Sequence, residues 1–122
     1  MTTRKEEEIM KLVIAIIQPH KLEDVKKELY QEEVNLLTVS EVLGHGRQKG
    51  VTEVYRGIKE TGNLLRKIQL EIAVNDNFLE RTLKAITKGA RTGETGDGKI
   101  FVLDLGECVR IRTGETGPEA IG

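Results

Sequence analysis

The feature that most constrains the fold is the order of two kinds of hydrophobic pattern along the chain. Continuous or alternating apolar runs are typical of strands, and apolar residues at i, i+3 and i+7 are typical of one face of a helix. These patterns follow each other as strand, helix, strand, strand, helix, strand. The strand-like segments are residues 11–18, 36–43, 64–74 and 100–105, and the helical stripes are residues 21–32 and 79–90.

This βαββαβ order predicts an α+β fold, the ferredoxin-like sandwich, with an antiparallel sheet and two helices on one face. The segment 64–74 alternates strictly, with Lys67, Gln69 and Glu71 on its polar side. We therefore expect the sheet face opposite the helices to be exposed to solvent or covered by another subunit. A short fifth strand is expected over residues 109–112.

Composition bounds the domain organisation and the class of partner. The chain has 122 residues, enough for one domain, and residues 1–9 are polar and aperiodic, so we expect a flexible N-terminal extension before a domain over residues 10–122. An aromatic content of 3% predicts a thin aliphatic core, which favours an oligomer. The net charge of −1 gives no case for nucleic acid. One cysteine and two histidines argue against a disulfide or structural zinc.

A glycine-rich segment over residues 91–103 is the strongest functional signal. Gly93 to Lys99 spells G-x-x-x-x-G-K, but Ile100 stands where a Mg²⁺-binding hydroxyl would be needed, and a helix precedes the segment instead of following it. A P-loop is therefore excluded. Phosphate binding through Lys99 and backbone amides of residues 96–98 stays open, because glycines let N–H groups approach an anion closely.

Three cationic residues extend this hypothesis. Arg110 and Arg112 are two apart, so on the expected strand both guanidinium groups would point to one face and could bind an oxyanion. The alternative is a solvated edge pairing with Asp104 or Glu107. Lys67 is either a surface lysine or a ligand-binding cation.

The segment 44–62 is polar, glycine-rich and long for a connection between two strands. Loops of this length in small domains are usually functional or disordered. We predict a long flexible loop between the second and third strands.

Several motifs together make the chain similar to the PII family of nitrogen-signalling proteins over residues 10–121. They are Ala-Ile-Ile-Gln-Pro-His-Lys-Leu at 15–22, Thr-Val-Ser-Glu-Val at 38–42, Gly-Arg-Gln-Lys-Gly at 46–50, Thr-Glu at 52–53, Tyr-Arg-Gly at 55–57, the glycine-rich segment at 92–102 and Arg-Ile-Arg-Thr-Gly at 110–114.

The resemblance implies a homotrimer that binds ATP or ADP between subunits and binds 2-oxoglutarate through a Mg²⁺ ion. It implies three sets of ligand-binding residues. The nucleotide set is Thr38, Gly44, Gly46, Arg47, Gln48, Gly96, Asp97, Gly98, Lys99, Arg110 and Arg112; the 2-oxoglutarate set is Gln48, Lys49, Gly50 and Lys67; the metal ligand is Gln48.

The family also implies a signalling role and not an enzymatic one. The loop would present Tyr55 and Arg56 to a target, either an ammonium transporter or an enzyme of nitrogen assimilation, and the protein would be cytoplasmic, with recruitment to the membrane through a transporter. Two departures stand out: Gln18 replaces a basic residue common in the family, and Glu60 replaces the tyrosine that accepts a nucleotidyl group.

Two other functions stay open on the sequence. One is a small ATP-hydrolysing enzyme with Asp97 or Glu94 as general base. The other is a ferredoxin-like regulatory module that binds another metabolite.

Overall fold

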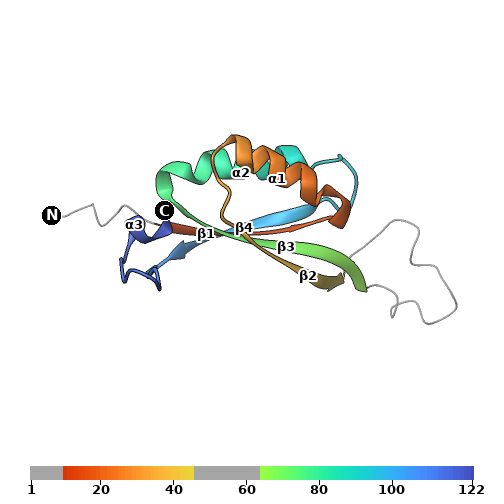
Figure 1. Ribbon diagram of the computed structural model, residues 1–122. Coiled ribbons are helices and arrows are strands. Elements are labelled where there is room, and N and C mark those ends of the chain that lie inside the picture. The colour runs from red at the N-terminus through yellow and green to blue at the C-terminus, as the bar shows by residue number, and fades with distance from the viewer. Residues whose placement is uncertain (1–9, 46–63) are drawn as a thin grey trace, which may run out of the picture.

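The computed structural model describes residues 10–45 and 64–122. One antiparallel sheet has the strand order β2-β3-β1-β4 (Figure 1). Its strands are β1 (Met10–Ile17), β2 (Thr38–His45), β3 (Leu64–Asn75) and β4 (Gly98–Leu105); the helices are α1 (Leu22–Gln31), α2 (Leu79–Ala90) and α3 (Pro118–Ile121), with 3-10 turns η2 (Pro19–Lys21) and η4 (Asp76–Phe78). The predicted ferredoxin-like order is confirmed.

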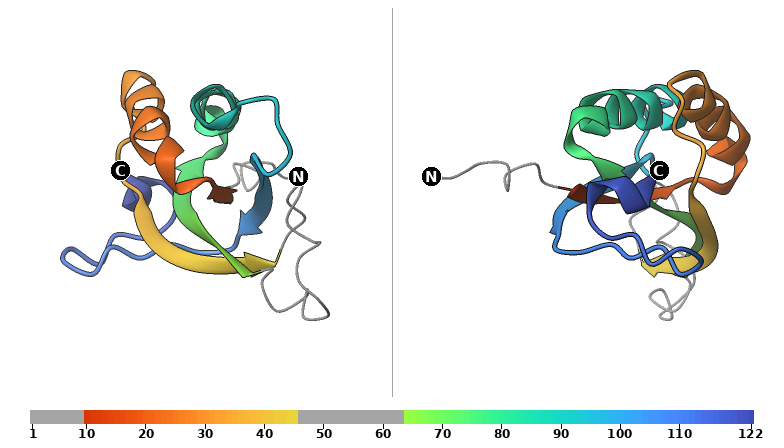
Figure 2. Two further views of the ribbon diagram at one scale, coloured as in Figure 1. Left: turned by 90° about the vertical axis from the view of Figure 1, so that its right-hand side faces the viewer. Right: turned by 60° about the vertical axis from the view of Figure 1, so that its left-hand side comes forward.

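Both long helices lie on the same face of the curved sheet (Figure 2). The alternation of β3 aims Ile68, Leu70, Ile72 and Val74 at these helices, where all four are buried. The helices approach each other closely at Gly89, where an added Cβ would lie 2.7 Å from the Cα of Val25. The rest of the core is also aliphatic and contains Val13, Ala15, Ile17, Val25, Leu29, Val34, Ala85, Ile86 and Ala90.

The opposite face of the sheet carries a band of apolar side chains that no described segment covers. Leu12 and Ile14 of β1 stand beside Leu103 and Phe101 of β4, which are 47% and 49% exposed. Since paired residues on neighbouring strands point to one side, these four side chains form one continuous patch. The predicted polar side of β3 borders it with Gln69 and Glu71.

Residues 109–112 do not form the predicted fifth strand. They belong to a narrow hairpin whose one bridge pairs Val109 with Thr116. The backbone amide of Arg110 donates to the carbonyl of Glu115, and the carbonyl of Arg110 accepts from the amide of Gly114. The hairpin turns at Gly114, which has φ +81°. A turn so close behind leaves too few residues to reach the sheet edge.

The second strand has the predicted length but lies two residues later, at Thr38–His45 instead of 36–43. Gly44 pairs with Leu65 inside β2–β3, and β2 runs to His45, so the loop does not begin at residue 44 as expected. Pairing with β3 fixes this end, because the hydrogen-bonded register continues up to Leu64. The rest of the predicted loop and the predicted N-terminal extension lie outside the described residues.

Candidate functional site

The segment 92–98 joins α2 to β4 and makes one end of the candidate site. Gly96 and Gly98 have φ of +102° and +110°. At Gly98 an added Cβ would lie 1.8 Å from the carbonyl oxygen of Ile16, so only glycine lets β4 start against β1 here. Lys99, the next residue, pairs with Ile16 and has an exposed side chain. The predicted phosphate-binding glycines and lysine are therefore brought together.

The carboxylate of Asp97 faces its own loop. Oδ2 accepts hydrogen bonds from the backbone amides of Thr92 and Gly93, both at 2.8 Å, and Oδ1 accepts one from the Thr92 hydroxyl at 2.5 Å. The Thr92 hydroxyl, followed by the two amides, holds the pKa of Asp97 below its ordinary value. The sequence pattern did not identify this role of Thr92, although Thr92 lies at the start of the glycine-rich segment.

Lys67 reaches this loop from β3. Its Nζ donates to the carbonyl oxygen of Gly96 at 3.2 Å. Gly44 lies next to it on β2, where an added Cβ would be 3.6 Å from the Lys67 Cγ, and the Gln18 amide nitrogen lies 3.3 Å from the Cβ position of Gly96. Residues far apart in sequence thus converge at the ends of β2, β3 and β1.

Arg110 lies elsewhere. Its guanidinium pairs with Glu115 at 2.9 Å and donates to the backbone carbonyls of Glu119 and Ala120 at 3.4 and 3.3 Å. It therefore holds α3 in place. The sequence pattern missed this role.

The alternative partners named from sequence are engaged elsewhere. Asp104 pairs with Lys11 at 2.6 Å, and the carboxylate of Glu107 accepts from the amide of Cys108 at 2.9 Å. Arg112 is exposed in the hairpin turn, so the expected common strand face of Arg110 and Arg112 is wrong.

The start of β4, which carries Lys99, and the short helix α3, which Arg110 contacts, lie at opposite ends of the sheet (Figure 1). Lys99 is opposite Ile16 near the end of β1. Arg110 binds α3, whose Pro118 carbonyl accepts from Asn75, the residue opposite Met10 at the start of β1. Because a strand rises about 3.3 Å per residue, six positions separate the two ends by roughly 20 Å. Thr38 lies between them, at the start of β2 opposite Glu71.

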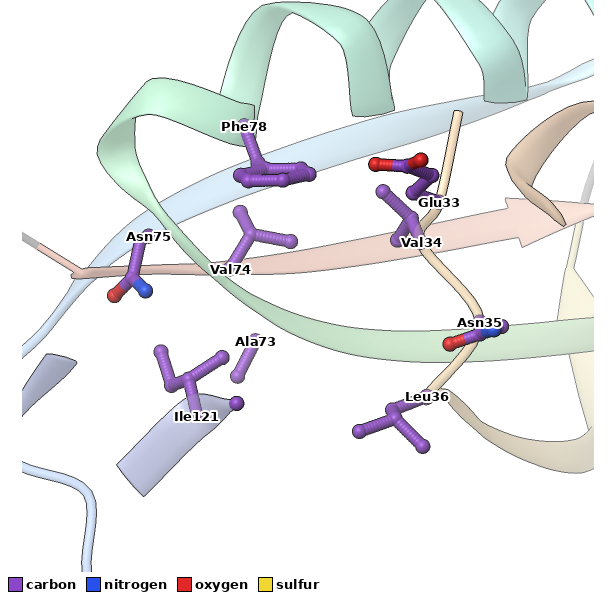
Figure 3. Close-up of a pocket in the computed structure, with 10 residues that line it drawn as sticks. Glu33, Val34, Asn35, Leu36, Ala73, Val74, Asn75, Phe78 and Ile121 are labelled. Carbon is purple, nitrogen blue, oxygen red and sulfur yellow. The ribbon is translucent and has the colours of Figure 1, made fainter. Parts of the chain in front are cut away.

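A small pocket opens beside α3, between Phe78 and Val34 on the helix side and Leu36 and Ile121 on the other (Figure 3). Its volume is about 90 Å³, and the Oδ1 atom of Asn75 at its edge is buried without a hydrogen-bond partner. A pocket of this size holds only a few non-hydrogen atoms, so it does not accommodate a nucleotide within one chain.

Seven predicted site residues fall outside the described segments: Gly46, Arg47, Gln48, Lys49, Gly50, Tyr55 and Arg56. Within residues 10–45 and 64–122, no three histidine, cysteine or acidic side chains gather as a metal site would require. No helix in the same segments is long and apolar enough to cross a membrane.

Comparison with known proteins identifies the family. Residues 10–115 match the family model "Nitrogen regulatory protein P-II". The chain is 58% identical to nitrogen regulatory protein GlnK1 of Methanosarcina mazei, over 92% of this chain and 97% of that protein. It is 50% identical to nitrogen regulatory protein P-II of Rhizobium etli, over 92% of this chain and all of that protein.

A solved structure agrees with the fold. The crystal structure of Arabidopsis thaliana PII bound to citrate superimposes with a TM-score of 0.76 at 34% identity, and the match covers 93% of this chain and 92% of that one. The relatives are named as regulatory proteins, which sets the chain apart from enzymes. The chain belongs to the P-II family of nitrogen regulatory proteins.

Proposed function

We propose that this P-II family member is a homotrimer that binds ATP or ADP in clefts between subunits and binds 2-oxoglutarate together with Mg²⁺. Each cleft would take Lys99 and the amides of residues 96–98 from one subunit, and Arg110 and Arg112 from the next. The single observation that carries this arrangement is the separation of Lys99 from Arg110 by roughly 20 Å of sheet. No single phosphate group could touch both in one chain, whereas a second copy would bring them together.

The uncovered apolar patch supports a trimer. Leu12, Ile14, Phe101 and Leu103 lie on the sheet face away from α1 and α2. Contiguous apolar surface of this kind marks a contact with another protein, and in a closed ring every copy would cover its neighbour's patch.

The second ligand would bind beside the phosphates. Lys67 already lies against Gly96 and could turn its ammonium toward a carboxylate of 2-oxoglutarate. The amide oxygen of Gln48 would ligate Mg²⁺ alongside phosphate oxygens, with Lys49 and Gly50 nearby in sequence. The remaining nucleotide contacts would come from Thr38, Gly44, Gly46 and Arg47.

Regulation would pass through the segment that follows His45. The residues that flank it, His45 and Leu64, pair with each other, and the adjacent Gly44 lies beside Lys67, so a ligand at Lys67 would act close to the base of the segment. Tyr55 and Arg56 would contact the target, an ammonium transporter at the membrane or a cytoplasmic enzyme of nitrogen assimilation. Asp97 is poorly placed to act as a general base for ATP hydrolysis, because both of its carboxylate oxygens already accept hydrogen bonds.

Mixed trimers test the shared cleft. Lys99→Ala and Arg110→Ala should each weaken ATP binding about tenfold or more, since each removes a charge-assisted contact to phosphate. When the two variants are co-expressed in equal amounts, roughly a quarter of the clefts should combine an intact Lys99 with an intact Arg110 from the neighbour. Calorimetry should then recover that fraction of high-affinity sites.

The outcomes separate the parts of the proposal. Light scattering should give a mass near three times 13.6 kDa, and a monomer at micromolar concentration would contradict the trimer. A stable mixed trimer without recovered sites would contradict the shared cleft. Binding of 2-oxoglutarate that needs neither ATP nor Mg²⁺ would contradict the metal-bridged ligand.

A further inference from the structure

We infer that Asp97 is a positioning residue: its carboxylate fastens the 92–98 segment in the shape that presents the loop amides and Lys99 to phosphate, without touching the phosphate itself. This role rests on the proposed nucleotide site. It also replaces the expectation that Asp97 could serve as a general base there.

The geometry closes the loop on itself. The amides of Thr92 and Gly93 and the hydroxyl of Thr92 all donate to the Asp97 carboxylate, within 2.5–2.8 Å. Both carboxylate oxygens are used, and the chain between the two ends forms a ring. Charge-assisted hydrogen bonds of this length are the strong ones, so they fix the relative positions of residues 92 and 97.

The charge also argues that the carboxylate faces inward. A carboxylate turned toward a triphosphate would repel it, yet this one stands in the same turn as the proposed phosphate ligands. Three hydrogen bonds from within the loop satisfy this charge, and the side chain of Lys99, two residues later on β4, stays exposed and, within the described chain, forms no ion pair with Asp97.

Two further contacts fix the far end of the segment. Lys67 donates to the carbonyl oxygen of Gly96, and Gly98 lies tightly against the backbone of Ile16. The hydrogen bonds of Asp97 therefore join this fixed end to the exposed residues 92–95, which follow the end of α2. Without these hydrogen bonds, residues 92–95 should become mobile while the pairing of β4 with β1 is retained.

Two variants that each remove one negative charge from the loop test this role, because it predicts different changes in ATP affinity for the two. Glu94 is exposed in the same loop, and in the described chain its carboxylate forms no hydrogen bond, so Glu94→Gln removes a negative charge at a similar place without loosening the loop. ATP affinity measured by calorimetry should rise slightly or stay constant in Glu94→Gln, because repulsion is relieved. In Asp97→Asn it should fall about tenfold, because the amide group cannot accept the same three hydrogen bonds.

Thr92 gives a second test that keeps the charge. Thr92→Ser retains the hydroxyl and should bind ATP as the wild type does. Thr92→Val lacks the hydroxyl and should weaken ATP binding, but by less than Asp97→Asn does. The combined Thr92→Val and Asp97→Asn variant should be less than additive, because both act through one contact. Circular dichroism on all variants checks that the sheet and helices are retained.

These measurements distinguish failure of the positioning role from failure of the proposed nucleotide site. Wild-type protein that binds no ATP would overturn the nucleotide site and the positioning role together. Wild-type protein that binds ATP through Lys99, with Asp97→Asn binding as tightly as Glu94→Gln or more tightly, would overturn the positioning role alone.

Discussion

The sequence Arg-Thr-Gly-Glu-Thr-Gly occurs twice in this chain, at residues 91–96 and 112–117, and the two copies form opposite ends of the molecule. Locally they are alike. The glycines at the third and sixth positions all have positive φ, +92° and +102° in the first copy and +81° and +78° in the second. In both copies the threonine hydroxyl accepts from the amide of the glutamate two residues later, at 3.1 and 3.2 Å.

The copies differ in what each one contacts. Asp97 follows the first copy, and its carboxylate pulls the loop into a ring against β4. Pro118 follows the second and begins α3, while Glu115 pairs with Arg110. Six identical residues therefore set the same positive-φ glycines, and the residue that follows, with its neighbours in space, decides whether the turn leads into β4 or into the terminal helix α3.

The largest expected change in the free energy of unfolding comes from replacing a glycine that packs tightly against another strand, compared with glycines that only form turns. Gly98→Ala should lower the free energy of unfolding by about 3 kcal/mol or more, because it adds a clash with the Ile16 carbonyl to an unfavourable φ. Gly93→Ala and Gly114→Ala, with nothing within 4 Å, should each cost only about 1 kcal/mol. Denaturant unfolding at fixed protein concentration measures all three, and equal costs for Gly98 and Gly93 would contradict the assignment.

A smaller effect is expected at the glutamates in the fourth position of each copy. Glu115 accepts from Arg110 at 2.9 Å and from the Thr113 hydroxyl at 3.0 Å, so Glu115→Gln should destabilise the protein by about 0.5 kcal/mol, a small value because the pair is partly exposed. Glu94→Gln should leave the free energy of unfolding unchanged. Thermal unfolding of the two variants side by side decides this, and a larger loss in Glu94→Gln would reverse the comparison.

The smallest effect is a local response to acid. The folded pKa of Asp97 lies below the ordinary value of 3.8, chiefly because of the Thr92 hydroxyl and then the Thr92 and Gly93 amides, with Lys21 contributing. The ionised carboxylate of Asp97 therefore stabilises the folded state fully at pH values above the ordinary pKa. This stabilisation is lost as the pH falls through the lower folded pKa. The amide resonance of Gly93 should shift in that acid range. Gly114 donates to a backbone carbonyl at 2.7 Å and should not follow the same titration.

Much of the fold follows from short-range patterns. The alternation of β3 selects which side chains are buried, and the stripe of α2 selects its core face, because these periods are properties of the backbone. The end of β2 was mispredicted, since Gly44 reads as a loop residue and only its pairing with Leu65 makes it part of a strand. The supposed strand at 109–112 failed for the converse reason: Glu115 competes for Arg110 at closer range than any sheet edge.

The sequence by itself determined the order of strands and helices, the glycine-rich connection before the last strand and the family resemblance, because each depends on residues close together in the chain or on their recurring identity. Tertiary structure alone decided that Lys67 meets Gly96 and that Arg110 lies at the far end of the sheet from Lys99. These contacts depend on which strands lie side by side and in what register, and a register is set by the packing of the whole core.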